Sequence, residues 1–267
     1  MPYSHLPHFT LVEPQGLGLV NPVAADLALL ERLAADPGHP LAQLWTAPTC
    51  LVVPRSYQRH AALDAVRERF AAQGCPVYLR SSGGGLVPQG PGMLNLSLAY
   101  VVRGMPGEWA EPVYLHLCEM LRGPLHSLGL ATHWQAVEGS FCDGRFNLAC
   151  THEGRARKIA GTAQYWRPLP APPGTAPGSL RAHAVLAHAV LLVNADLPAA
   201  HVLTNGFEQA LDSSRHYDPD STINVAQALA PVQGPGNQAD TMQALHSLLA
   251  DSVCRCGPPG KAETAVS

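Results

Sequence analysis

Segments whose apolar residues alternate as in strands are interleaved along this chain with segments whose apolar residues recur at helical spacing. Several strand segments follow one another closely enough to form hairpins. The expected strands cover residues 49–53, 76–79, 94–102, 147–150, 158–166 and 184–193. The expected helices cover residues 24–35, 57–73, 108–122 and 238–253. This order predicts an α+β or α/β domain built on a mainly antiparallel or mixed sheet.

Glycine and proline mark the ends of several of these segments. Gly74 is expected to cap the second helix, and Gly123-Pro124 to stop or kink the third. A turn is expected at Glu153-Gly154, and the proline-rich stretch 169–178 reads as a surface loop.

The composition excludes several classes of protein. The chain has 267 residues, of which 46% are hydrophobic and 14% charged, with a net charge of -3 and no basic run. Nucleic acid is therefore a poor partner, and a chain of this length can bury a sizeable core. Its seven cysteines include no CxxC pair, which disfavours a disulfide scaffold or a zinc ribbon, and no metal site is expected. With no secretory signal or membrane-spanning run in the sequence, we expect a cytoplasmic protein with no membrane partner.

A strand that runs directly into Arg80-Ser81-Ser82-Gly83-Gly84-Gly85 is the first candidate site. Consecutive glycines lose much backbone freedom on folding, and a turn alone rarely needs three. The segment could be a flexible loop, or its N–H groups could bind a carboxylate or phosphate. The spacing fits neither the dinucleotide fingerprint nor the P-loop.

The second candidate site lies between Phe141 and Gln164. Cys142 precedes an Asp-Gly turn, which favours exposure, although a free cysteine is more often a buried structural thiol. Lys158 opens a strand, where a lysine is usually a solvated edge residue. Gly161 in the middle of that strand indicates that another group approaches it closely.

These segments occur in a recognisable order. RSSGGGLVPQGPGMLNLSLAY, GSFCDGRFNL, RKIAGTAQ and AHAVLLVNADL, which fall within residues 44–197, resemble the lipoate–protein ligase A / octanoyltransferase family, itself related in fold to biotin protein ligases. The resemblance implies an α+β fold with a mixed, mainly antiparallel sheet flanked by helices, forming a single catalytic domain over residues 1–253 with a flexible tail over 254–267. It also implies an acyl pocket whose walls comprise Arg80, Ser82, Gly83, Gly84, Gly85, Leu86, Val87, Asn95, Gly161, Thr162 and Ala163, with His188 nearby.

The segment around Cys142 looks like that of the cysteine-dependent octanoyl transferase branch. In that branch a cysteine takes the acyl group as a thioester, and the resemblance implies that Lys158 stabilises the oxyanion and holds the thiolate. The ligases usually have a His-Asp pair after the glycine loop, where this chain has Pro88-Gln89. The implied reaction moves an octanoyl or lipoyl group between lipoyl-carrier domains without a cofactor.

Three alternatives stay open from the sequence. The chain could be an ATP-dependent lipoate–protein ligase that uses Lys158, the glycine loop, ATP and Mg²⁺ to form lipoyl-AMP. It could be a non-catalytic protein that binds a fatty acid or a lipoyl domain, and biotin is a further possible substrate. His188 could equally be a core or rim residue. The polar stretch 212–217 could suggest a hydrolase triad, but nothing in the sequence places its residues in triad geometry.

Overall fold

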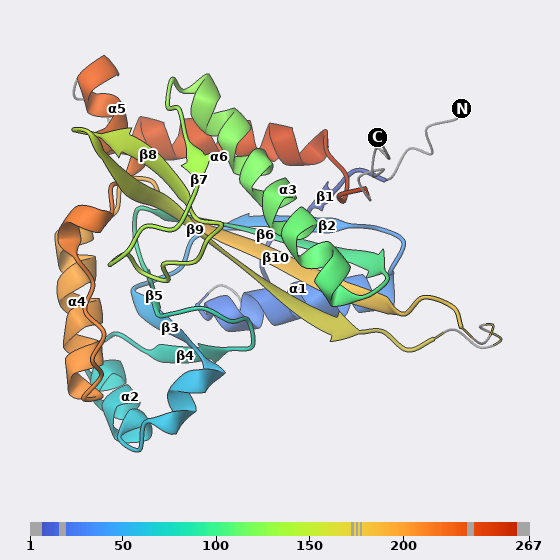
Figure 1. The fold of residues 1–267 in the computed structure, drawn as a ribbon, viewed down its shortest axis with the longest axis horizontal. Coiled ribbons are helices and arrows are strands. Elements are labelled where there is room, and N and C mark those ends of the chain that lie inside the picture. Colours follow the sequence, from blue (N-terminus) through green and yellow to red (C-terminus); the bar gives the residue numbers. More distant parts are fainter. Residues whose placement is uncertain are drawn as a thin grey trace.

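The computed structural model describes residues 7–15, 20–171, 174, 176, 178–233 and 238–260. Within these ranges the chain forms two β-sheets, with helices packed on both faces of the larger one (Figure 1). The larger sheet has seven strands in the order β1-β2-β6-β10-β9-β8-β7, and the smaller has three in the order β4-β3-β5. The predicted α+β fold with a mixed, mainly antiparallel sheet is confirmed.

Every neighbouring pair in the larger sheet is antiparallel except β1 with β2. Its strands are β1 (Thr10–Leu11), β2 (Leu41–Trp45), β6 (Met93–Arg103), β7 (His133–Trp134), β8 (Leu148–His152), β9 (Arg155–Pro168) and β10 (Ala182–Leu192). The predicted turn between β8 and β9 is present, with Glu153 at φ 50° and Gly154 at φ 73°.

Alternation along β6 decides which residues reach the functional face of the sheet. Leu94, Leu96 and Leu98 point into the main core, which they share with α3 (Pro106–Ser127) and α6 (Gln238–Cys254). Successive side chains of a strand point to opposite faces, so Asn95 and Ser97 face the other way. On that other face, α1 (Pro22–Ala35) packs Leu29, Leu30 and Leu33 against β2, β6 and β10 (Figure 1).

The smaller sheet carries the glycine loop. It consists of β3 (Cys50–Pro54), β4 (Val77–Arg80) and β5 (Val87–Gln89), with β3 parallel to β4 and antiparallel to β5. Its apolar face packs against α2 (Leu63–Ala72) and α4 (Leu197–Ala210). The glycine loop spans the short connection from β4 to β5, which places it at the end of this sheet.

Two predicted helices have different bounds in the structure. The segment 57–73 is divided into a 3-10 helix, η2 (Arg55–Arg59), and α2, while Gly74 ends α2 at φ 81° as predicted. Helix α3 continues past Gly123-Pro124 to Ser127. Pro124 and Leu125 are both buried there, so continued packing outweighs the backbone hydrogen bond that proline removes.

Several elements were not predicted. These are β1, β2, β5, β7, α4, η3 (Pro219–Ser221) and α5 (Val225–Gln233). The described residues of the stretch 169–178 form no helix or strand, as expected, while 172, 173, 175 and 177 lie outside the described residues.

The expected tail is packed where it begins. The Phe9 N–H donates to the Cys256 carbonyl at 2.8 Å, and His116 Nε2 lies 3.0 Å from the Gly257 carbonyl. These contacts involve the first residues of the expected tail, and residues 261–267 lie outside the described residues. None of the helices in the described ranges is long and apolar enough to cross a bilayer.

Candidate active site

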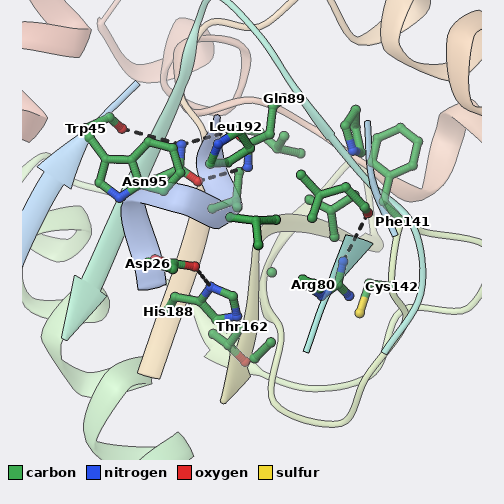
Figure 2. A pocket seen from close by; sticks show the side chains of 18 of the residues that line it. Asp26, Trp45, Arg80, Gln89, Asn95, Phe141, Cys142, Thr162, His188 and Leu192 are labelled. Atoms are coloured by element: carbon green, nitrogen blue, oxygen red, sulfur yellow. Dashed lines mark hydrogen bonds and ion pairs between the residues drawn. The ribbon is translucent and has the colours of Figure 1, made fainter. Parts of the chain in front are cut away.

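A pocket lies between α1, the larger sheet and the smaller sheet (Figure 2). Its lining is mostly apolar, with a few polar groups drawn from six different elements. The lining residues are Pro22, Val23, Asp26, Trp45, Val52, Arg80, Val87, Pro88, Gln89, Asn95, Phe141, Cys142, Lys158, Gly161, Thr162, Ala163, His188, Val190 and Leu192.

The exposure of the lining distinguishes an open side from a closed side. Thr162, Ala163 and His188 on β9 and β10 are half-buried, whereas Gln89 and Asn95 are 5% and 3% exposed. The side-chain amides of Gln89 and Asn95 form two reciprocal hydrogen bonds at the closed side, each N–H group donating to the other amide's oxygen at 2.9 Å. Because these amides satisfy one another, they can sit beside a hydrocarbon chain.

Cys142 lies in the connection between β7 and β8, in a backbone conformation that L-residues rarely adopt. Its φ is 51°, and the side chain is 8% exposed. The Cys142 carbonyl accepts hydrogen bonds from the Gly144 N–H at 2.9 Å, Asn147 Nδ2 at 2.7 Å and Lys158 Nζ at 2.9 Å. These three donors hold the strained turn and so fix the direction of the thiol.

The glycine loop meets Cys142 directly. The Gly85 N–H donates to Cys142 Sγ at 3.2 Å. Gly84 has φ 101°, and a Cβ built on it would lie 2.5 Å from Cys142 Sγ. The loop therefore needs glycine at 84 for two reasons, the backbone angle and the space that the sulfur occupies.

The loop has a different role from the one expected. Arg80, Val87 and Asn95 line the pocket as predicted, but Ser82, Gly83, Gly84, Gly85 and Leu86 are not among its lining residues. Leu86, which directly precedes β5, is fully buried in the core between the smaller sheet, α2 and α4.

Arg80 holds the loop in shape. Its guanidinium donates to the carbonyls of Val52 at 3.0 Å, Gly83 at 2.9 Å and Gly85 at 2.6 Å. Burial lowers the pKa of Arg80, and the nearby Cys142 opposes that shift. Arg80 therefore places a buried positive charge near the thiol while it fixes the backbone that contacts the sulfur.

Replacing Gly84 with alanine tests the contact between the loop and the thiol. We expect thioester formation at Cys142 to fall about a hundredfold, because the added methyl group displaces the sulfur by an ångström or more. The left-handed backbone should also cost about 1–2 kcal/mol of stability. Gly74→Ala is the matched control, since Gly74 has φ 81° and open space around its would-be Cβ. Equal rates in both variants, measured by mass spectrometry, would contradict the role of the contact.

Lys158 is buried, at 3% exposure, with its ammonium beside the Cys142 turn. Besides the Cys142 carbonyl, Nζ donates to the Phe141 carbonyl. A Cβ on Gly161 would lie 3.1 Å from Nζ, so the close approach inferred for Gly161 comes from Lys158 itself. The alternative reading of Lys158 as a solvated edge residue is wrong.

Burial lowers the pKa of Lys158 to about 8, against a partly compensating attraction to Cys142. Because the ammonium loses its proton above that value, we expect the rate of thioester formation to decrease as the pH rises through about 8. A reaction that needed only a thiolate would instead speed up with pH. The unfolded chain binds more protons at Lys158 between about 8 and 10.5, so this group adds stability as the pH rises through that window. The rate of thioester formation and the free energy of unfolding, each measured between neutral and alkaline pH, check the expected decrease in rate and the expected gain in stability.

His188 also lines the pocket, as part of a chain of polar groups that starts on α1. Its Nδ1 lies 2.7 Å from Asp26 Oδ2, and its Nε2 lies 3.1 Å from Ser82 Oγ. Figure 2 shows Asp26 and His188 side by side on one side of the pocket, with Cys142 on the other. His188 is therefore a half-buried residue of the pocket lining with two polar partners.

Asp26 is the functional candidate that sequence reasoning missed. It lies on the buried face of α1 with Ala25, Leu29 and Leu33, whereas Leu27 on the same helix is 44% exposed. A carboxylate at a core position of an amphipathic helix was the available signal. Trp45 and Gln89 were missed because β2 and β5 were not predicted.

Asp196 has a structural role and is not part of the pocket lining. Asp196 caps α4 by accepting from the Ala199 N–H at 3.0 Å. Within the described ranges no three His, Cys, Asp or Glu side chains gather as a metal site.

The structure thus brings together an apolar pocket, a thiol with a backbone N–H directed at it and a buried ammonium, which makes this pocket the candidate active site. Residues 20–249 match the family model described as the lipoyl protein ligase A/B catalytic domain. The chain belongs to this family, and it is an enzyme of the acyltransferase or lipoate–protein ligase type. The resemblance noted in the sequence is thus confirmed.

Individual relatives agree with this assignment. The chain is 55% identical to an uncharacterized protein of Cupriavidus necator over 240 residues, covering 90% of this chain and 93% of that one. It is 38% identical over 215 residues to a Kyrpidia tusciae protein named octanoyl-[GcvH]:protein N-octanoyltransferase. This match covers 78% of this chain and 69% of that one.

Solved structures share the fold. One is a lipoate-protein ligase A bound with ATP, at a TM-score of 0.59 and 19% identity, covering 92% of this chain and 85% of that one. Another is a lipoate protein ligase from T. acidophilum with bound lipoic acid, at a TM-score of 0.55, 17% identity and the same coverage.

Proposed function

We propose that this enzyme transfers an octanoyl or lipoyl group to a lysine of a lipoyl-carrier domain through a thioester at Cys142, without a cofactor. The observation that carries the proposal is the thiol itself. Cys142 Sγ lies on the wall of an apolar pocket and accepts the Gly85 N–H at 3.2 Å. A donor aimed at sulfur stabilises the thiolate, the form that attacks carbonyl carbon.

The first step uses Cys142, Lys158 and Arg80. The Cys142 thiolate attacks the carbonyl carbon of the carrier-bound acyl group, and the bond to the donor carrier breaks as that carrier takes up a proton. Lys158 and Arg80 supply positive charge near the sulfur, and backbone donors stabilise the oxyanion that forms on the way. The acyl chain lies along the apolar walls, where each buried CH₂ contributes about 0.8 kcal/mol.

The second step moves the acyl group from Cys142 to the acceptor. The amine of a lysine attacks the thioester, the amide forms and the thiol returns. Both carriers are lipoyl domains in this proposal, and the supporting comparison is the relative named as an octanoyltransferase that takes its octanoyl group from GcvH. ATP is not needed in this reaction, because one acyl–carrier bond breaks and another forms, with the acyl group held on Cys142 between the two steps.

An ATP-dependent ligase is the competing reading, supported by the fold shared with ligase structures. That reaction would use ATP and Mg²⁺, and Cys142 would be dispensable. The place of the usual His-Asp pair is taken by Pro88 and Gln89, and Gln89 is bonded to Asn95 at the closed side of the pocket. This site therefore differs from the ligases at a position in the acyl wall itself.

Two parallel incubations separate these functions. Purified enzyme receives either octanoylated carrier with apo lipoyl domain, or free lipoate with ATP, Mg²⁺ and apo lipoyl domain, and the intact acceptor is weighed. Acyl transfer in the first mixture without nucleotide supports the proposal. Product only in the second mixture supports the ligase, and product in neither points to a binding protein or to another substrate such as biotin.

A further inference from the structure

Three side chains from distant parts of the sequence form a row at the open side of the pocket. Asp26 on α1 contacts His188 on β10 at 2.7 Å, and His188 contacts Ser82 of the glycine loop at 3.1 Å. These are the distances at which a base and its orienting carboxylate operate in enzymes.

Asp26 is held so firmly that it fixes the histidine ring. Its other oxygen, Oδ1, accepts from Ser97 Oγ at 2.7 Å, and Ser97 Oγ in turn accepts from Trp45 Nε1 at 3.1 Å. A carboxylate takes only acceptor roles, so it selects the tautomer with the proton on Nδ1 of His188. The lone pair of Nε2 then faces the Ser82 hydroxyl.

The second half of the transfer reaction needs such a lone pair. An acceptor lysine is an ammonium ion at neutral pH and must lose a proton before it attacks a thioester. Lys158 is poorly placed to take that proton, because its Nζ already donates to the carbonyls of Phe141 and Cys142. Arg80 cannot accept one either, since its guanidinium stays protonated.

The position of His188 suits an incoming lysine. His188, Thr162 and Ala163 are half-buried residues of the pocket lining, so a side chain from a partner domain can reach them from solvent. Ser82, its hydrogen-bond partner, belongs to the same short loop as Gly84 and Gly85, which touch Cys142 Sγ. Two residues of chain span at most about 7 Å, so one short loop connects the row on one side of the pocket with the thiol on the other.

We propose, on the basis of the transferase function above, that His188 is the catalytic base for the acceptor lysine and that Asp26 is its positioning residue. The lysine ammonium takes the place of the Ser82 hydroxyl at Nε2 and gives one proton to His188. The neutral amine forms a bond to the thioester carbon, the C–S bond breaks with its electron pair going to Sγ, and the second amine proton passes to that sulfur. His188 then releases its proton to solvent, which balances the step.

The test follows discharge of a preformed acyl-enzyme. Wild type, His188→Gln and Asp26→Asn are loaded with octanoyl donor, freed of donor, and mixed with either apo lipoyl domain or hydroxylamine at neutral pH. Hydroxylamine is already neutral there and needs no base. We expect His188→Gln to slow discharge to the lipoyl domain about a hundredfold and to leave discharge to hydroxylamine unchanged. Asp26→Asn should slow the same step.

A second histidine on the same strand gives the matched control. His183 is 7% exposed and lies outside the pocket lining, so His183→Gln should discharge to both nucleophiles at the wild-type rate. Wild-type discharge to the lipoyl domain by both His188→Gln and Asp26→Asn overturns the proposal, as does equal slowing toward both nucleophiles. If wild-type enzyme gains no acyl mass, the transferase function is overturned, and the proposed roles of His188 and Asp26 fall with it.

Discussion

Replacing Cys142 with serine is expected to lower ATP-independent transfer to a lipoyl domain by about a thousandfold or more. Serine keeps the size of the side chain and can still accept the Gly85 N–H, so the fold and pocket should be unchanged. The hydroxyl is scarcely ionised at neutral pH and is a far weaker nucleophile than a thiolate. Transfer is measured as the acyl mass gained by the acceptor domain over time.

Cys150→Ser is the control for this variant. Cys150 is 1% exposed on β8, and burial raises the pKa of its thiol, which makes it inert. We expect this variant to transfer at the wild-type rate, apart from a small loss of stability. Full activity in Cys142→Ser would assign the reaction to a mechanism that needs no thioester.

Replacing Lys158 with methionine is expected to slow thioester formation about a hundredfold to a thousandfold. Methionine fills similar space but removes the charge near the sulfur and the two hydrogen bonds that hold the Cys142 turn. Arginine is not a conservative replacement here, because a planar guanidinium cannot reproduce the two hydrogen bonds of a compact ammonium in the same buried space. The measurement is the rate at which the enzyme gains acyl mass in the absence of acceptor.

Arg155→Met is the control for the charge change. Arg155 is an exposed cation three residues earlier on β9, so its loss changes the net charge equally without touching the pocket. Wild-type acylation of Lys158→Met would show that the ammonium serves packing rather than chemistry. Slow acylation that recovers when the turn is stabilised elsewhere would place the effect in the backbone alone.

The sequence predicts the core of the fold well, because that part depends on local periodicity. The strands at 94–102 and 184–193 match β6 and β10 to within two residues at each end. Those strands are long and strongly patterned, and they pair with each other over their whole length. The short strands β2 and β5 have no such pattern, since β2 is buried at every residue and β5 contains Pro88.

The site was predictable only where a residue type is unusual for its place. Gly161 in a strand and three consecutive glycines after a strand both signal close approach, and both prove to contact the Cys142–Lys158 pair. The sequence could not show which way the glycine loop faces. The loop directs the Gly85 N–H to the sulfur rather than lining the pocket, and Arg80 fixes this arrangement by binding the Gly83 and Gly85 carbonyls.

Asp26 shows the remaining gap between sequence and structure. It lies 162 residues from His188, and only the packing of α1 against β10 brings them together. A helix can bury a carboxylate when tertiary contacts supply donors, here from Ser97 and His188. Nothing in the local pattern of α1 identifies those donors.

The location of the acyl group in a trapped intermediate tests the central claim most directly. Enzyme is incubated with octanoylated carrier in the absence of acceptor, quenched with acid, digested and mapped by mass spectrometry. The account predicts the octanoyl group on the peptide that contains Cys142, and its release by neutral hydroxylamine. An octanoyl group found only on another residue, or an enzyme that never gains one while the acceptor is still modified, would contradict it.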